Sequence, residues 1–129
     1  MELPPEAERL LRSTALAHLA TINKDGSPQL TPLWIDVEDG RPVMNTAVGR
    51  LKERNIRRDP RVTLEVTDLE DPEVYVEIRG TAELVLEGAR DHANRLAMKY
   101  TGEPFDNFQP GVDRISIVVT PRRVLFHNS

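Results

Sequence analysis

The chain has 129 residues, a formal net charge of −4 and no cysteine, and this length suits a single domain. The lack of cysteine excludes disulfides, thiol nucleophiles and cysteine-ligated metal centres. No apolar run approaches the roughly 20 residues of a membrane-spanning helix, and the acidic start MELPPEAERLLR has the pattern of neither a signal nor a transit peptide. We therefore expect one cytoplasmic domain, residues 1–129, without a membrane partner.

The first part of the chain is predicted to form a short helix and then a meander of three strands. Residues 5–13 have the proline start and the paired leucines of a helix. Asp25-Gly26 and Asp39-Gly40 are typical hairpin turns. Pro32 lies inside the second strand, which predicts an edge or bulged strand. The three strands are expected over residues 15–23, 27–39 and 41–48.

The second part is predicted to alternate helices and strands. One helix should end at Asp59-Pro60, because a residue before proline avoids helical geometry. Gly80 predicts a bulge or bend in a long strand. Helices are expected over residues 50–59 and 88–102, and strands over 61–68 and 74–87. A sixth strand closes the chain in two segments, 115–120 and 124–127. Six strands with short turns and one crossover helix favour a small closed or split β-barrel, mainly β in class.

The segment VGRLKERNIRRDPRV, residues 48–62, gathers positive charge in an otherwise acidic chain. Glu53 and Asp59 are its only acidic residues, and Glu53 can pair with Arg57 at i, i+4. Nucleic-acid binders usually carry basic residues over a whole face, whereas this cluster is local and suits a small anionic ligand. A solvated helix face is the alternative. The basic residues are Arg50, Lys52, Arg54, Arg57, Arg58 and Arg61.

Four segments occur along the chain in the order LATINKDGSPQLTPLWIDVEDG, NTAVGRLKERNIRRDPRV, YVEIRG and RLAMKYTG. Together they resemble the pyridoxamine-5'-phosphate-oxidase-like split β-barrel proteins, and more narrowly the branch that uses the deazaflavin coenzyme F420, class B of the flavin/deazaflavin oxidoreductases. The resemblance covers nearly the whole chain. It implies a six-stranded split β-barrel of the FMN-binding type that forms a homodimer, with two cofactor sites at the subunit interface.

The resemblance also implies which residues hold the cofactor. The turn and helix after the third strand hold its phosphate in this family, and a helix start with nearby cations suits an anion physically. Residues implied for the phosphate and ribityl side are Arg50, Lys52 and Asn55, with Arg54 as a weaker candidate. Residues implied for the ring are Thr31, Pro32, Trp34, Met44, Asn45 and Thr46, together with Tyr75 from the second subunit. Arg114 is a further candidate, whereas Arg57, Arg58 and Arg61 are expected in surface contacts or salt bridges.

The chemistry is expected to come from the cofactor, because no catalytic motif stands out. The three histidines lie apart in the sequence, and His92 is expected to be exposed on the crossover helix. The resemblance implies hydride transfer from reduced coenzyme F420 to a small unsaturated or quinone-like substrate. FMN is the alternative cofactor, and non-catalytic cofactor binding is the alternative role. The chain stops at Ser129 without a pyridoxal-phosphate-binding segment, which argues against vitamin B6 oxidation.

Overall fold

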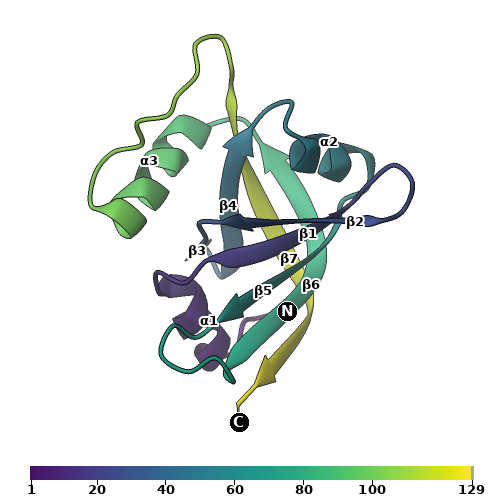
Figure 1. Ribbon diagram of the computed structural model, residues 1–129, viewed down its shortest axis with the longest axis vertical. Helices are drawn as coiled ribbons and strands as arrows, with labels where there is room; N and C mark the ends of the chain where they lie inside the picture. Colours follow the sequence, from purple (N-terminus) through teal and green to yellow (C-terminus); the bar gives the residue numbers. More distant parts are fainter. Residues whose placement is uncertain (129) are drawn as a thin grey trace.

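The computed structural model describes residues 1–128, which form one antiparallel sheet and three helices (Figure 1). The seven strands lie in the order β2-β1-β5-β6-β7-β4-β3. Their bounds are β1 Ala17–Ile22, β2 Pro28–Leu33, β3 Asp36–Glu38, β4 Arg41–Ala47, β5 Arg61–Thr67, β6 Tyr75–Val85 and β7 Arg114–His127. The prediction of a mainly β protein is therefore confirmed.

The predicted strand over residues 27–39 is two strands, so the sheet has seven strands and the predicted three-stranded meander is wrong. β2 pairs with β1 and forms one edge of the sheet, whereas β3 pairs with β4 and forms the other edge. The predicted edge position of Pro32 is confirmed. The chain therefore crosses from one edge to the other between Leu33 and Asp36.

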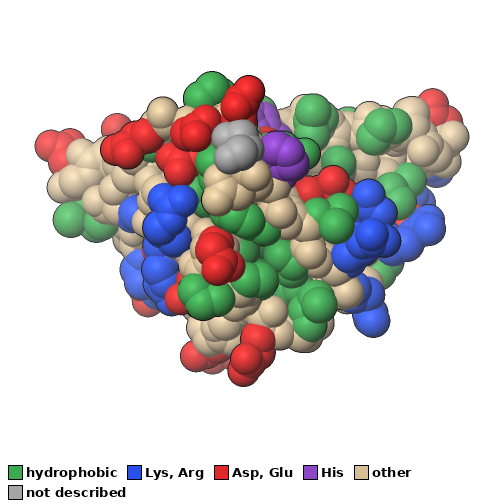
Figure 2. Space-filling model, turned by 90° about the horizontal axis from the view of Figure 1, so that it is seen from below, with side chains coloured by type: hydrophobic (Ala, Val, Ile, Leu, Met, Phe, Trp, Pro, Cys, Tyr) green, Lys and Arg blue, Asp and Glu red, His purple; other side chains and the backbone are tan. Residues whose placement is uncertain are grey.

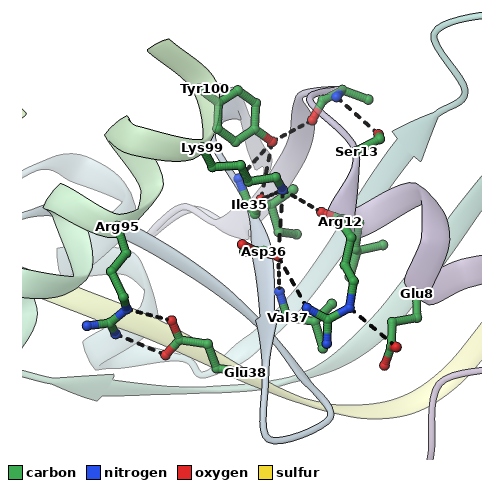
Figure 3. A network of polar contacts seen from close by, with 12 residues as sticks. Glu8, Arg12, Ser13, Ile35, Asp36, Val37, Glu38, Arg95, Lys99 and Tyr100 are labelled. Atoms are coloured by element: carbon green, nitrogen blue, oxygen red, sulfur yellow. Dashed lines mark hydrogen bonds and ion pairs between the residues drawn. The ribbon is translucent and has the colours of Figure 1, made fainter. Parts of the chain in front are cut away.

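Polar contacts from the end of α3 (Ala89–Thr101) hold this crossing in place (Figure 3). The Ile35 backbone N–H donates to the Tyr100 hydroxyl at 3.1 Å, and that hydroxyl donates to the Ala15 carbonyl at 2.6 Å. Lys99 Nζ donates to the carbonyl oxygens of Leu11 and Ile35. In a continuous strand, the backbone N–H and carbonyl of Ile35 would form hydrogen bonds with a neighbouring strand. Here the side chains of Tyr100 and Lys99 bond to these groups instead, so β2 can end and β3 can begin at the other edge.

The core lies inside the curled sheet, and α1 (Pro5–Arg12) and α2 (Leu51–Arg58) lie at opposite ends of it (Figure 1). α1 adds Leu10 and Leu11 to the core, as the sequence predicts. α3 packs outside the sheet against β4 and β7. Within residues 1–128, no helix is long and apolar enough to cross a membrane. The largest fully buried side chains include Leu19, Ile35, Met44, Leu64, Ile78 and Ile117.

Gly80 is the point at which the long strand β6 changes register against β7. The pairing shifts between Arg79 and Gly80, which confirms the predicted bulge. A Cβ atom at Gly80 would overlap the carbonyl oxygen of Thr120, so only glycine allows this close approach. The two expected strand segments at the end of the chain are one continuous strand, β7, because β6 pairs with it on both sides of the bulge.

The surface at the lower end of the sheet carries charges of both signs (Figure 2). Acidic side chains gather along one border, and basic side chains form separate clusters on the two sides, with hydrophobic side chains between them. The positive charge on this face is thus divided and does not form one continuous basic surface.

Candidate functional site

A pocket of about 350 Å³ lies at the N-terminal end of α2, where β2, β4 and β7 approach α3 and the loop that follows it. One wall of the pocket is polar and the other is apolar, and none of the lining residues is acidic. The polar wall consists of Asn45, Thr46, Arg50, Lys52, Asn107 and Arg114. The apolar wall consists of Leu16, Pro32, Leu33, Trp34, Ala93, Leu96 and Phe105.

Three cations converge on the polar wall, and the part of the chain that the structure describes gives them no counter-ion. Within residues 1–128, Arg50, Lys52 and Arg114 form no ion pair. Burial lowers the pKa of Lys52, and the positive charges of Arg50 and Arg114 lower it further. Burial and Arg50 likewise lower the pKa of Arg114. A cluster of like charges is unfavourable in the free protein, and a bound anion would relieve the repulsion.

The start of α2 adds a second source of positive potential to the same wall. Gly49 has a φ of 96°, which lets the chain turn sharply into the helix. No side chain of the described residues caps α2, and the first N–H groups of a helix lack intrahelical acceptors. Such a helix start, with the partial charge of the helix dipole, favours a phosphate or carboxylate.

Glu53 lies on α2 close to the cations, but its carboxylate is paired with groups of the same helix and of the turn before it. Its carboxylate accepts the Gly49 backbone N–H at 2.8 Å and the Arg57 guanidinium at 2.8 Å. The hydrogen bond from Arg57, and then that from Gly49, lower the pKa of Glu53 in spite of its burial. Glu53 therefore shapes the turn into α2 and leaves the three pocket cations unneutralised.

The apolar wall is built around Trp34. Its ring stacks on Tyr100 with centroids 5.5 Å apart, and the edge of Phe105 meets it at 6.5 Å. The Arg114 guanidinium lies 4.7 Å from the Phe105 ring centroid and so joins the two walls. Flat aromatic groups beside a cationic cluster can hold a planar ring that carries an anionic chain.

The pocket contains six of the eleven cofactor-binding residues predicted from the sequence, as well as the further candidate Arg114. The six are Pro32, Trp34, Asn45, Thr46, Arg50 and Lys52. They come from β2, the crossing after it, β4 and the start of α2. The structure thus brings residues from separate segments to one place, as the resemblance implies.

The other five predicted residues lie outside the pocket of the single subunit. Met44 is fully buried in the core, and Thr31 has a buried Oγ1 without a hydrogen-bond partner among the described residues. Arg54 is exposed. Asn55 is buried, and its amide donates to the side chains of Thr21 and Asn23. Tyr75 stacks on His127 at the start of β6, so a contribution of Tyr75 from a second subunit stays a prediction.

The surface contacts and salt bridges expected of the remaining basic residues are present in the structure. Arg57 pairs with Glu53, and Arg61 pairs with Asp59 at 2.7 Å. Arg58 donates to the Ile22 carbonyl and to Asn55 Oδ1. These three arginines are held by groups of their own chain.

Some residues of the pocket were not among the site residues predicted from the sequence. Ala93 and Leu96 lie on the inner face of α3, and Phe105 and Asn107 lie in the irregular segment after it. The expected exposure of His92 is wrong: the side chain is only 3% exposed, because the face of α3 that carries it packs against β4 and β7. The sequence signal that could have placed residues 103–112 at the apolar wall of the pocket is the pair of aromatic residues, Phe105 and Phe108, in this irregular segment.

The fold and the pocket define a class of protein, a small split β-barrel with a cluster of cations next to an aromatic wall. Residues 3–128 match the model of a family described as "Pyridoxamine 5'-phosphate oxidase". The chain therefore belongs to the pyridoxamine 5'-phosphate oxidase family.

Solved structures agree with this assignment. A structure named F420 Reductase is 31% identical, with a TM-score of 0.85, over 95% of this chain and 98% of that chain. The conserved hypothetical protein Rv2991 from Mycobacterium tuberculosis is 29% identical, with a TM-score of 0.80, over 99% and 86% of the two chains. HupZ from Group A Streptococcus, 22% identical with a TM-score of 0.71 over 98% of each chain, shares the fold. The expected split β-barrel is thus confirmed.

Proposed function

We propose that the protein is an oxidoreductase that binds coenzyme F420 in this pocket and transfers hydride from its reduced form to a small unsaturated or quinone-like substrate. The observation that carries the proposal is the cluster of Arg50, Lys52 and Arg114, which has no acidic partner among residues 1–128 and adjoins an aromatic wall. Family membership supports a flavin or deazaflavin cofactor, and the similarity to a structure named F420 Reductase favours the deazaflavin.

The residues present fit such a cofactor. The start of α2 and the three cations would hold a phosphate, because guanidinium and ammonium groups form charge-assisted hydrogen bonds with its oxygens. Trp34 and Phe105 would bound a planar ring. A volume of about 350 Å³ is near the lower end of the range for ligand pockets. A cofactor with a long side chain would therefore extend beyond the pocket.

The cofactor, when bound, supplies the hydride, and the pocket residues bind the cofactor and orient its ring. The lining residues include no carboxylate and no histidine, so the described residues place no general acid of ordinary pKa in the pocket. The proton that completes the two-electron reduction is then expected to come from solvent. The apolar wall around Trp34 and Leu96 would exclude water from the face of the ring that it covers.

The proposal is tested by fluorescence titration of the protein with oxidised F420 and, separately, with FMN. Lys52→Met removes one pocket cation, and Arg58→Met is the matched control because Arg58 lies on the same helix but outside the pocket. Preferential F420 binding that Lys52→Met weakens and Arg58→Met does not would support the proposal. Preference for FMN would identify a flavin as the cofactor in place of F420. Equal losses of cofactor affinity in both variants would refute the assignment of the pocket as the cofactor site.

Turnover separates an enzyme from a cofactor-binding protein. Reduced F420 is mixed with the protein and a panel of quinone and enone acceptors, and its reoxidation is followed by absorbance. Acceptor-dependent reoxidation that Lys52→Met slows would support hydride transfer. Tight binding without reoxidation by any acceptor would favour the non-catalytic role.

We further propose that two subunits form a homodimer and that the second subunit covers the part of the cofactor outside the pocket. The modest volume of the pocket supports this arrangement. Size-exclusion chromatography with light scattering, with and without F420, measures the mass. A monomer that binds F420 tightly would overturn the dimer and leave the pocket assignment standing.

A further inference from the structure

His92 is a buried histidine that lies behind the pocket and is not used by the proposed function. Its Nδ1 lies 2.8 Å from Ser116 Oγ and 3.2 Å from Asn45 Nδ2. Asn45 lines the pocket, whereas His92 does not. The histidine therefore contacts the anion site through one intermediate residue.

The neighbours of Asn45 allow its amide only one orientation. Its Nδ2 lies 2.9 Å from the carbonyl oxygen of Ala89, which can only accept. Its Oδ1 lies 2.9 Å from Arg114 Nε, which can only donate. The amide nitrogen therefore also faces His92, so in this contact Nδ1 of the imidazole is the acceptor, and the Ser116 hydroxyl, which can donate or accept, adapts to it. A histidine that accepts at Nδ1 carries its proton on Nε2 and is neutral.

The surroundings of His92 favour this neutral form. Burial is the largest effect and lowers the pKa of His92, Arg95 lowers it further, and Glu38 and Asp36 act in the opposite direction. Glu38 is itself paired with Arg95 at 3.0 Å. Within residues 1–128, His92 Nε2 is buried and has no hydrogen-bond partner. The charged groups around the ring are Asp36 and Glu38 on β3, Glu87 before α3, Asp91 and Arg95 on α3, and Arg114 on β7 behind Asn45.

We propose that His92 is a positioning residue of the anion site: its unprotonated Nδ1 holds Asn45, and Asn45 in turn holds Arg114 beside Arg50 and Lys52. Protonation of His92 places an N–H against the Asn45 amide nitrogen, so this contact breaks and Arg114 loses its fixed acceptor. The anion site is then complete only while His92 is neutral. By linkage, a bound anion keeps His92 neutral.

The inference rests on the proposed function only for the identity of the anion, because all these contacts belong to the free protein. It can therefore be tested first without a cofactor. The ¹⁵N signals of the His92 ring and of Arg114 Nε are followed by NMR as the pH is lowered. The inference expects an Nε2-protonated ring at neutral pH and a shift of the Arg114 signal with the same midpoint as the His92 titration. If the ¹⁵N chemical shift of Arg114 Nε did not change over the pH range in which His92 titrates, the inference would be overturned.

The second test measures F420 affinity against pH in matched variants. His92→Gln can accept from Asn45 but cannot titrate, whereas His92→Phe cannot accept. His18→Gln is the control, because His18 is an exposed histidine that pairs with Glu65. We expect His92→Phe to weaken binding about fivefold to tenfold, the equivalent of about one hydrogen bond. We expect the affinity of the wild type to decline at acid pH, and His92→Gln should retain the affinity without this decline.

The sign of the pH effect separates positioning from simple electrostatics. If His92 acted only through its charge, its protonation would strengthen anion binding, and this result would overturn the inference. Failure to bind either F420 or FMN would refute the proposed function, and the NMR titration would still decide on His92. Tight F420 binding with no coupling between His92 and Arg114 would refute the positioning role alone.

Discussion

Replacement of Lys52 by methionine should weaken anion binding and, at the same time, stabilise the free fold. Lys52 is half-buried between Arg50 and Arg114, forms no ion pair within residues 1–128, and has a lowered pKa. Methionine keeps most of the aliphatic chain and removes the charge. Repulsion at such a partly solvated site is screened and amounts to about 0.2–1 kcal/mol for each pair. We expect a gain of about 0.5–1 kcal/mol in the free energy of unfolding, or about 2–4 °C in Tm.

The same substitution should weaken F420 binding by roughly tenfold to a hundredfold. A hydrogen bond from a charged group contributes about 1.5–3 kcal/mol, and each 1.4 kcal/mol is about one factor of ten in affinity. Arg58→Met, the control, is expected to lower the stability of the fold without a change in F420 binding. Arg58 donates to the Ile22 carbonyl and to Asn55, so its loss should lower stability by about 1 kcal/mol and leave binding unchanged.

Thermal unfolding and fluorescence titration of both variants, at low and at high salt, provide the assay. The sign of the pH dependence is a further check. The folded-state pKa of Lys52 lies below its ordinary value of 10.5, so the unfavourable charge is fully present below the folded pKa and is relieved as the pH rises toward 10.5. The stability advantage of Lys52→Met should shrink over that interval. A variant that loses stability and still binds F420 normally would refute this reasoning.

Three further substitutions test the fold. Tyr100→Phe leaves a buried backbone N–H unpaired at the crossing between β2 and β3 and should cost about 1–3 kcal/mol in a urea titration. Gly80→Ala places a Cβ on a carbonyl oxygen of β7 and should lower stability by about 2 kcal/mol, measured by thermal unfolding. The side-chain hydrogen bond from Arg61 lowers the pKa of Asp59 to about 2. The contribution of the ionised Asp59 to the free energy of unfolding should be lost as the pH falls from 3.8 through about 2. In an acid-unfolding titration, Asp59→Asn should therefore lack the loss of stability that the wild type undergoes in this pH range.

The sequence predicts those features of the fold that depend on local backbone geometry. Asp25-Gly26 forms the hairpin between β1 and β2, and α2 ends before Asp59-Pro60. Pro32 lies on an edge strand and Gly80 on a bulge. Each of these residues restricts or frees φ by itself, so its effect does not depend on the rest of the chain. β1, β5, β6 and α2 have nearly the predicted bounds, whereas β2 ends well before the predicted residue 39.

Features that depend on distant contacts could not be predicted in this way. The end of β2 is set by Lys99 and Tyr100, about 65 residues further along the chain. The burial of His92 depends on how α3 packs on the sheet, because the buried face of the helix includes His92 as well as the apolar residues whose spacing marks that face. Phe105 reaches the pocket from an irregular segment that has no periodic pattern to place it.

The crossing that local patterns do not reveal is also what builds the pocket. Because the chain leaves β2 after Leu33 and starts β3 at the opposite edge, Trp34 lies between the two edges of the sheet. Tyr100 holds the backbone of the next residue, Ile35, and stacks on the Trp34 ring. The same side chain thus ends the strand and sets the position of the aromatic wall beside the cations of α2. Site and fold share this one junction, so a residue that fixes the crossing also fixes the geometry in which a ring and an anion could bind together.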